Sequence, residues 1–311
     1  MSALPVILIC DHRGRGLAER LRALRTGGVE LEVSTHLRST REFLERRRPE
    51  LIVVDPLVGA GRVELAEIDR LRGEAPRVPV LLVTDRETPL QAATLGGTFS
   101  DDAWDLVHRD ATLEEFDLRM SRLRDHVERL EELDELRYIA VHDDRTDLLR
   151  PRAFQDRLRE HFSAAQRHGF ELALILVDLD DFGRINKAHD HTVGDLVIER
   201  VGAAIRSSLR AEDIAGRLGG DEFAILLPYT SRRDAAHAAA RIRSSIGELG
   251  ALFAERGIDV RVTASLGFET FAGGDLATVD ELRLHAEAAL REAKARGGDF
   301  GVYYRSLAIG S

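Results

Sequence analysis

The first third of the chain alternates short aliphatic runs with longer amphipathic ones. The aliphatic runs have the length of buried strands, and the segments between them have the mixed composition of surface helices. The expected strands cover residues 5–11, 29–35, 51–57 and 78–85, and the expected helices cover 15–27, 39–49 and 63–76. Strands that alternate with helices form a parallel sheet covered on both faces. Residues 1–112 are therefore predicted to form a doubly wound α/β domain.

Residues 111–141 contain neither Gly nor Pro and are rich in Leu, Glu and Arg, which predicts one long helix. Its apolar residues recur at alternating steps of four and three, the spacing that closes a seam between two helices. They are Phe116, Met120, Leu123, Val127 and Leu130. The pattern predicts a helical dimerisation stalk over 113–142. The alternative is a single helix packed on its own domain, because two heptads are short evidence for a coiled coil.

The pattern changes after about residue 143. The expected strands are 171–178, 214–218, 223–228, 260–271 and 300–304, and the expected helices are 194–209, 231–249 and 279–296. The second and third strands are separated by "GGDE", and glycines supply the positive φ that tight hairpin turns require. Residues 143–311 are therefore predicted to form an α+β domain with a mixed sheet flanked by helices.

The composition, 44% hydrophobic and 32% charged, is that of a folded and soluble chain. The formal net charge of −10 argues against binding to a nucleic-acid backbone. The one cysteine, Cys10, cannot form an internal disulfide, which fits a reducing compartment. The sequence contains neither a signal-peptide pattern nor an apolar run of the roughly 20 residues that a membrane helix needs. We expect a cytoplasmic protein with no membrane contact.

Two carboxylates stand at strand ends in the second half. Asp178 ends one predicted strand, and Glu222 begins another just past the hairpin turn. If these strands are neighbours, the two carboxylates converge on one hard cation such as Mg²⁺, which suggests phosphate chemistry. Successive strand residues point to opposite faces, so Glu222 is placed as a fixed ligand and Asp221, nearer the turn, can meet a substrate or a second ion.

Four motifs occur in order along this half. They are "DDRTDLLRPRAF" (143–154), "DLDDFGRINKAHDHTVGD" (178–195), "GGDEF" (219–223) and "AEAALREAKARGGD" (286–299). With them, residues 143 to about 305 resemble the GGDEF family of diguanylate cyclases. The resemblance implies a nucleotide-cyclase-like fold and the joining of two GTP molecules into cyclic di-GMP with release of two pyrophosphates. It also implies a homodimer, because each domain holds one GTP.

The resemblance also implies a role for each matching residue. Asp178, Glu222 and the carbonyl of Leu179 would hold Mg²⁺ or Mn²⁺, while Asp221 would position or deprotonate the ribose 3′ hydroxyl or hold the second ion. Asn186 and Asp195 would read guanine, because a carboxylate accepts from the N–H donors that guanine has and adenine lacks. The other expected nucleotide contacts are Phe182, Gly183, His191, Gly219, Gly220 and Lys294.

Two further features concern regulation and activity. Arg210 and Asp213, with Arg241 on a later helix, resemble the family's inhibitory site for the cyclic product. Gly298 stands where relatives carry an arginine four residues after the lysine, and the loss of this phosphate contact predicts weaker activity. The alternative function is therefore a catalytically weak or inactive receptor for cyclic di-GMP.

The N-terminal half resembles a response-regulator receiver domain. Asp11, Asp55 and Thr84 stand at the ends of three predicted strands, where ligands gather in such sheets. The resemblance implies phosphorylation of Asp55 by an upstream histidine kinase. Two positions depart from the pattern, because His12 replaces a second acid and Arg109 stands at the lysine position. The alternative is a degenerate receiver kept for dimerisation.

Overall fold

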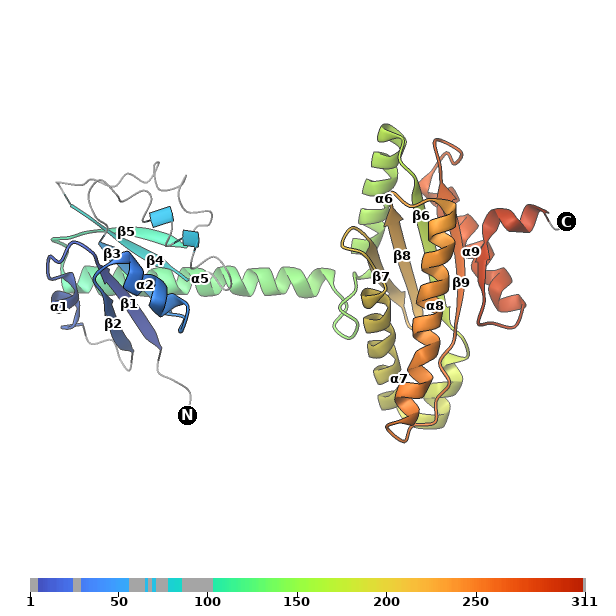
Figure 1. The fold of residues 1–311 in the computed structure, drawn as a ribbon, viewed down its shortest axis with the longest axis horizontal. Helices are drawn as coiled ribbons and strands as arrows, with labels where there is room; N and C mark the ends of the chain where they lie inside the picture. The colour runs from blue at the N-terminus through green and yellow to red at the C-terminus, as the bar shows by residue number, and fades with distance from the viewer. Residues whose placement is uncertain are drawn as a thin grey trace. The chain divides into compact units, whose positions relative to one another are not determined.

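The computed structural model describes residues 5–24, 29–55, 65–66, 69–70, 78–85 and 103–309. The chain divides into two compact units, 1–135 and 136–311, and each is described by itself (Figure 1). Most of the helix predicted for 63–76 lies outside the described residues.

The N-terminal unit is built on a parallel sheet, as predicted. Its strands are β1 (Val6–Asp11), β2 (Glu30–Ser34), β3 (Leu51–Asp55), β4 (Val80–Thr84) and β5 (Trp104–His108). They lie in the order β2-β1-β3-β4-β5, and every pair is parallel. Apolar residues of α1 (Leu17–Leu21) and α5 (Leu113–Val141) pack on one face of the sheet, and those of α2 (Leu37–Leu44) pack on the other.

Helix α5 corrects one prediction. Phe116, Met120 and Leu123 lie in the hydrophobic core of the N-terminal sheet, and Val127 is buried as well. These residues therefore pack on their own domain and do not form the predicted seam, because the start of the helix must cover one face of the sheet. The large apolar residues that α5 leaves exposed are mostly at its other end: Leu133, Leu136, Tyr138, Ile139 and Val141, together with Leu118.

The C-terminal unit contains a mixed sheet with helices on both faces. The helices are α6 (Pro151–His168), α7 (Phe182–Ser207), α8 (Arg232–Ala254), α9 (Val279–Ala295) and the 3₁₀ helix η1 (Tyr304–Ile309). The strands are β6 (Leu172–Leu179), β7 (Ile214–Gly219), β8 (Glu222–Pro228), β9 (Ala264–Phe271) and β10 (Gly301–Tyr303). The order is β10-β9-β6-β8-β7, and only the β10–β9 pair of this sheet is parallel.

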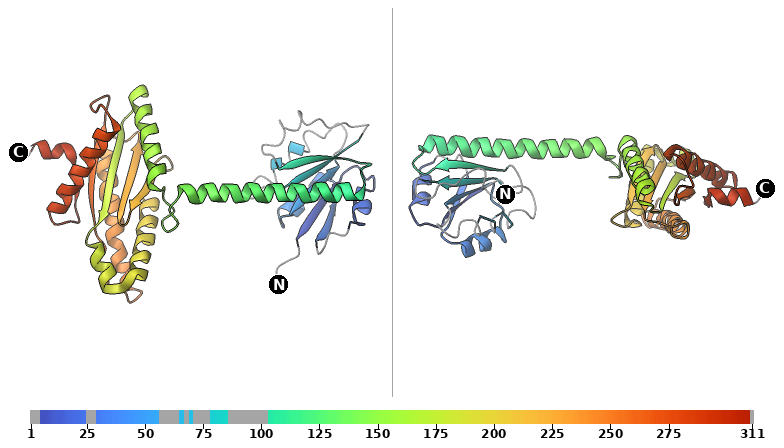
Figure 2. Two further views of the ribbon diagram at one scale, coloured as in Figure 1. Left: turned by 180° about the vertical axis from the view of Figure 1, so that it is seen from behind. Right: turned by 90° about the horizontal axis from the view of Figure 1, so that it is seen from above.

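Alternation along the strands divides the core of this unit into two layers. Phe223, Ile225 and Leu227 of β8 face the layer formed with α7 and α8, and Ala224 and Leu226 face the layer formed with α6 and α9. Figure 2 shows α8 on one side of the sheet and α6 and α9 on the other. The predicted hairpin of β7 and β8 is confirmed.

Strand β9 starts later than the predicted 260–271. The β6 ladder ends with Leu179 opposite Ala264, so residues 260–263 have no partner on β6.

Candidate active site

The two predicted metal ligands lie directly opposite each other. Strands β6 and β8 are antiparallel, and their register pairs Asp178 with Glu222. Directly opposed residues of an antiparallel pair have their side chains on the same face, here the face of α9. Asp178 is buried and Glu222 is exposed, so the pair spans the boundary between the core and the solvent.

Lys294 of α9 completes this cluster. Its Nζ lies 2.6 Å from Asp178 Oδ2. Burial raises the pKa of Asp178, Lys294 opposes that rise, and the neighbouring carboxylates Asp221 and Asp180 add to it. Within the described part of the chain, no group of three or more Asp, Glu, His or Cys side chains is arranged to bind a metal ion. The two opposed carboxylates nevertheless supply the hard oxygen donors that Mg²⁺ and Mn²⁺ prefer.

The turn that carries Asp221 is braced from two sides. Gly219 and Gly220 both have positive φ, as the hairpin requires. Arg217 donates from Nη2 and Nε to the Gly220 carbonyl at 2.7 and 3.1 Å, and its Nη1 lies 3.2 Å from Asp143 Oδ1. The backbone N–H of Leu179 donates to the Asp221 carbonyl at 3.2 Å. The turn is therefore held against β6 on one side and against the segment after α5 on the other.

Helix α7 is bent so that Asn186 lies against Gly194, the residue before Asp195. A straight helix would separate residues 186 and 194 by about 12 Å along its axis. Instead, a Cβ added to Gly194 would lie 1.8 Å from Asn186 Oδ1 and 3.4 Å from the Phe182 ring. Asn186 thus packs against the backbone immediately before Asp195. Gly183 and His191 are exposed on the same helix.

The comparison with known families rests on the same region. Residues 140–299 match the family model described as "Diguanylate cyclase, GGDEF domain". The chain belongs to this GGDEF family.

Relatives of the GGDEF domain include two proteins of Pseudomonas aeruginosa. The bifunctional diguanylate cyclase/cyclic di-GMP phosphodiesterase MucR is 34% identical over 172 residues, which is 55% of this chain and 24% of the relative. The diguanylate cyclase DgcP is 32% identical over 167 residues, which is 54% of this chain and 24% of the relative. The chain thus spans about a quarter of the length of these relatives.

Two solved structures resemble the GGDEF domain together with the preceding helix. The coiled coil and GGDEF domain of DgcB from Caulobacter crescentus, in complex with c-di-GMP, matches with a TM-score of 0.53 and 26% identity, over 60% of this chain and 98% of that one. The diguanylate cyclase SiaD of P. aeruginosa, in complex with its activator SiaC, matches with a TM-score of 0.50 and 32% identity. The match covers 61% of this chain and 78% of that one.

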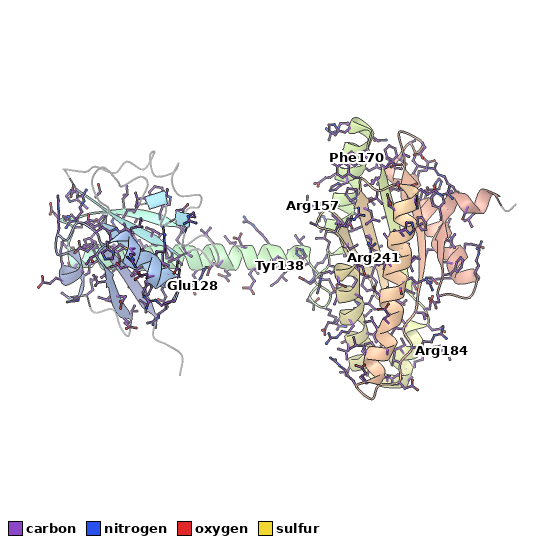
Figure 3. The ribbon with its side chains drawn as sticks, in the orientation of Figure 1. Glu128, Tyr138, Arg157, Phe170, Arg184 and Arg241 are labelled. Carbon is purple, nitrogen blue, oxygen red and sulfur yellow. The ribbon has the colours of Figure 1, made fainter. Side chains whose placement is uncertain are left out.

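The residues predicted for the inhibitory site of the GGDEF domain line one hollow. Arg210, Asp213 and Arg241 surround it together with His237 and Asp234, and Arg241 lies on α8 (Figure 3). Asp213 Oδ2 accepts a hydrogen bond from the Arg210 backbone N–H at 2.9 Å, and Arg241 donates to the Ser208 carbonyl at 2.8 and 3.1 Å. Burial raises the pKa of Asp213.

At Gly298, where the resemblance implies an arginine, the backbone conformation and the neighbouring Asp180 leave little room for a side chain. The φ of Gly298 is +77°, and a Cβ there would lie 2.9 Å from the Asp180 carboxylate. Asp180 accepts hydrogen bonds from Ser265 Oγ at 2.6 Å and from the Asp299 N–H at 2.7 Å, which hold this loop in place. The nearby Arg296 is engaged on its own helix and beyond it, since its Nε lies 2.8 Å from Glu292 Oε1 and its guanidinium lies over the Phe300 ring.

Three residues of the site were missed in the sequence. Arg145 forms an ion pair with Asp195, and Asp143 and Arg217 brace the turn. All three stand inside or beside the quoted motifs, but a charged residue in a loop gives no signal of its distant partner.

The acids of the N-terminal unit lie at the end of the sheet where they were predicted. Asp11 and Asp55 are opposite each other on neighbouring strands, and Thr84 ends the next strand. His12 Nε2 is 3.0 Å from Thr40 Oγ1, so the residue in place of the second acid belongs to a hydroxyl network. Arg109 contacts Asp55 directly.

Among the helices that the structure describes, none has the length and hydropathy of a membrane span.

Proposed function

We propose that this protein is a diguanylate cyclase that condenses two GTP molecules into cyclic di-GMP and two pyrophosphates. The observation that carries the proposal is the register of β6 and β8, which puts Asp178 opposite Glu222 beside Lys294 and the GGDEF turn. In each of the two reaction steps, a ribose 3′ oxygen forms a bond to the α-phosphorus of the other nucleotide. The bond from that phosphorus to pyrophosphate breaks, and the hydroxyl proton is released.

The chain supplies alignment and charge for this reaction. Mg²⁺ or Mn²⁺ held by Asp178, Glu222 and the Leu179 carbonyl would neutralise charge on the α-phosphate and lower the pKa of the attacking hydroxyl. Asp221, in the braced turn, orients that hydroxyl or accepts its proton. Lys294 supplies a positive charge to the nucleotide phosphates, to which the backbone around Phe182 and Gly183 also binds.

Base selection comes from the bend in α7. Asn186 lies there against Gly194, the residue before Asp195, and a carboxylate acceptor matches the N1–H and N2–H donors of guanine. Gly194 is required because any side chain would displace Asn186. Adenine lacks both donors on this edge, so ATP would form neither hydrogen bond to Asp195, which is expected to cost about 1–3 kcal/mol of binding relative to GTP.

The proposed enzyme works as a homodimer, because each domain holds one of the two GTP molecules. The exposed residues Leu133, Leu136 and Ile139 lie three positions apart, on one side of α5. They form a seam that a second copy of the helix can cover, and dimerisation raises the effective concentration of one half-site near the other. The N-terminal receiver-like unit regulates turnover through this helix.

Product inhibition is proposed to act through Arg210, Asp213 and Arg241, since these residues line one hollow. An arginine can grip phosphate or stack on guanine, and the aspartate accepts from the base. The alternative function, a cyclic di-GMP receptor with a weak catalytic site, is favoured by one observation. Gly298 provides no side chain for the phosphates.

One experiment separates the two functions. The full chain is incubated with GTP and Mg²⁺, cyclic di-GMP is measured by chromatography, and binding of added cyclic di-GMP is measured in parallel. If the protein is a cyclase, the original chain forms cyclic di-GMP and the Glu222→Ala variant does not. The Arg210→Ala variant is then less inhibited by added cyclic di-GMP than the original chain. The cyclase proposal fails if no product forms while cyclic di-GMP binds tightly and Arg210→Ala abolishes that binding.

A further inference from the structure

The acid pocket of the N-terminal unit is occupied by the protein's own arginines. Asp55 is 1% exposed and contacts the guanidinium of Arg109, and Arg13 Nε lies 3.7 Å from its other oxygen. Asp85 follows β4 directly. Its Oδ2 lies 2.7 Å from Arg13 Nη1, 3.2 Å from Arg15 Nη1 and 3.7 Å from Arg109 Nε. Three guanidinium groups therefore converge on two carboxylates at the end of the sheet.

This arrangement does not fit the divalent cation that a receiver domain implies. A cation beside Asp55 would lie next to Arg13 and Arg109, and the repulsion between positive charges at such short distances is large inside a protein. Asp11, the remaining acid, already accepts from the backbone N–H groups of Arg15 and Ala18. An arginine side chain does not lose its proton in a protein, so neither arginine can become neutral to admit a metal ion.

We propose that Asp55 anchors a permanent ion-pair network and is not a phosphoryl acceptor, with Arg13 and Arg109 in the place of the cation and the incoming phosphoryl group. The network also holds the connection to α5. Arg109 donates its backbone N–H to the Thr84 carbonyl at 2.8 Å, and Arg20 contacts the carbonyls of Arg109 and Ala111. The network thus anchors the start of α5 without a phosphorylation step.

Two measurements on the full chain, phosphorylation and thermal unfolding, test this proposal, and neither depends on cyclase activity. Acetyl phosphate with Mg²⁺ is expected to give no phosphorylated species on a phosphate-affinity gel. Asp55→Asn is expected to lower the Tm of the N-terminal unit by at least about 4 °C, because it removes the buried charge that Arg13 and Arg109 share and leaves Asp85 alone to neutralise the arginines. The double variant Asp55→Asn/Arg109→Gln is expected to have a higher Tm than Asp55→Asn alone.

The matched control is Asp105→Asn, because Asp105 also pairs with an arginine of the same unit but is 41% exposed. Its Tm is expected to stay within about 2 °C of the original chain. Phosphate mapped to Asp55, or an Asp55→Asn chain with an unchanged Tm, would overturn the proposal.

A second observation concerns the guanine pocket and rests on the proposed function. The ion pair of Arg145 and Asp195 joins the segment after α5 to the proposed guanine-reading carboxylate. Arg145 Nη1 contacts Oδ1 of Asp195, while the two N–H donors of guanine require both carboxylate oxygens. Arg145 therefore donates to one of the two oxygens that guanine would use, and its positive charge makes that oxygen a weaker acceptor for guanine.

The segment that carries Arg145 is fixed at several points. Thr146 donates to Asp143 Oδ1 from its hydroxyl at 2.7 Å and from its backbone N–H at 3.0 Å. Tyr138, at the end of α5, donates to Asp147, and Arg206 contacts the Thr146 carbonyl (Figure 3 labels Tyr138). A displacement at the end of α5 would therefore move Arg145 together with this segment.

We infer that Arg145 is a positioning residue that gates the guanine pocket and links it to α5. Both side chains of the pair are nearly half exposed, so the pair is expected to weaken the affinity for GTP by only about two- to fivefold. Arg145→Ala is expected to lower the KM for GTP by that factor with kcat unchanged. Added salt is expected to narrow the difference, because it screens the pair.

Nucleotide affinity is measured with a GTP analogue that has a methylene between the α- and β-phosphates, because this analogue binds but cannot react. Arg145→Ala should bind it about two- to fivefold more tightly, and Asp195→Ala should bind it weakly. Arg157→Ala is the control, because Arg157 forms an exposed ion pair within α6 (Figure 3). Weaker or unchanged analogue binding by Arg145→Ala overturns the gate alone. If the original chain neither binds the analogue nor makes product, the proposed function fails, and the gate fails with it.

Discussion

Lys294 Nζ lies 2.6 Å from Asp178 Oδ2, so the lysine neutralises the buried carboxylate that is proposed to bind the metal ion. Burial raises the pKa of Asp178, and Lys294 opposes that rise. Only the ionised carboxylate binds a metal ion, so the proposed activity is expected to be lost as the pH falls through this pKa.

Lys294→Met is therefore expected to raise the pKa of Asp178 further and to move the acidic limb of the kcat/KM profile to higher pH. It also removes a phosphate contact, which is expected to lower kcat/KM about 100-fold at neutral pH. Profiles at fixed Mg²⁺ test this, with Arg291→Met on the same helix as the control. An acidic limb that does not move would contradict the electrostatic role.

Restoring an arginine at position 298 is expected to harm the protein. The backbone there has φ +77°, and a Cβ would meet the Asp180 carboxylate at 2.9 Å. Gly298→Arg should therefore cost about 1–3 kcal/mol of unfolding free energy without raising activity. Thermal unfolding and turnover measure the two effects. Gly301→Ala is the control, because a Cβ at Gly301 meets no atom within 4 Å.

Leu136→Lys is expected to weaken the dimer. Leu136 is 55% exposed at the centre of the proposed seam, so the lysine should leave the folded chain intact and place two like charges in the dimer interface. Sedimentation should show monomers, and specific activity should fall at low protein concentration. Leu118→Lys is the matched control, because Leu118 is 49% exposed elsewhere on α5. Equal effects of the two variants would place the dimer contact elsewhere.

The pair of Asp143 and Arg217 predicts a stability that depends on pH. Burial would raise the pKa of Asp143, but the hydrogen bonds from Thr146 and the charge of Arg217 outweigh it, so the folded-state pKa is lowered. The stabilisation is therefore present at neutral pH and is lost as the pH falls through that lowered pKa.

Asp143→Asn should reduce the unfolding free energy at pH 7 by about 1–3 kcal/mol, and the difference from the original chain should vanish in acid. Denaturant unfolding at several pH values measures it. Asp144→Asn is the control, because Asp144 is 3.8 Å from Arg150 and 74% exposed. A difference that persists unchanged into acid would contradict the assignment.

The fold and the central pair of acids could be predicted because each rests on a local pattern. The alternation of runs predicts the parallel sheet, and two glycines between apolar runs predict the hairpin that places Glu222. Periodicity shows that α5 has an apolar face but not what covers it. The residues from Phe116 to Val127 are covered by their own sheet, because that face would otherwise be open to water.

The contacts that adjust the site could not be predicted from the sequence. Arg145 and Asp195 are 50 residues apart, and Arg109 and Asp55 are 54 apart, so their pairing depends on the tertiary fold. Similarly, Gly298 looks like a lost arginine in the sequence. Only the structure shows that a carboxylate occupies the space beside it.

Asp178 lies on the middle strand of its sheet, where β6 pairs with Glu222 of β8 on one side and with Ser265 of β9 on the other. The backbone amides of such a strand exchange with solvent only in the rarest openings of a domain. The position of the proposed metal ligand should thus be among the last in the unit to exchange. Evolution can therefore alter the regulation of the proposed enzyme through surface loops and the helix that precedes the domain, while the centre of the sheet stays unchanged.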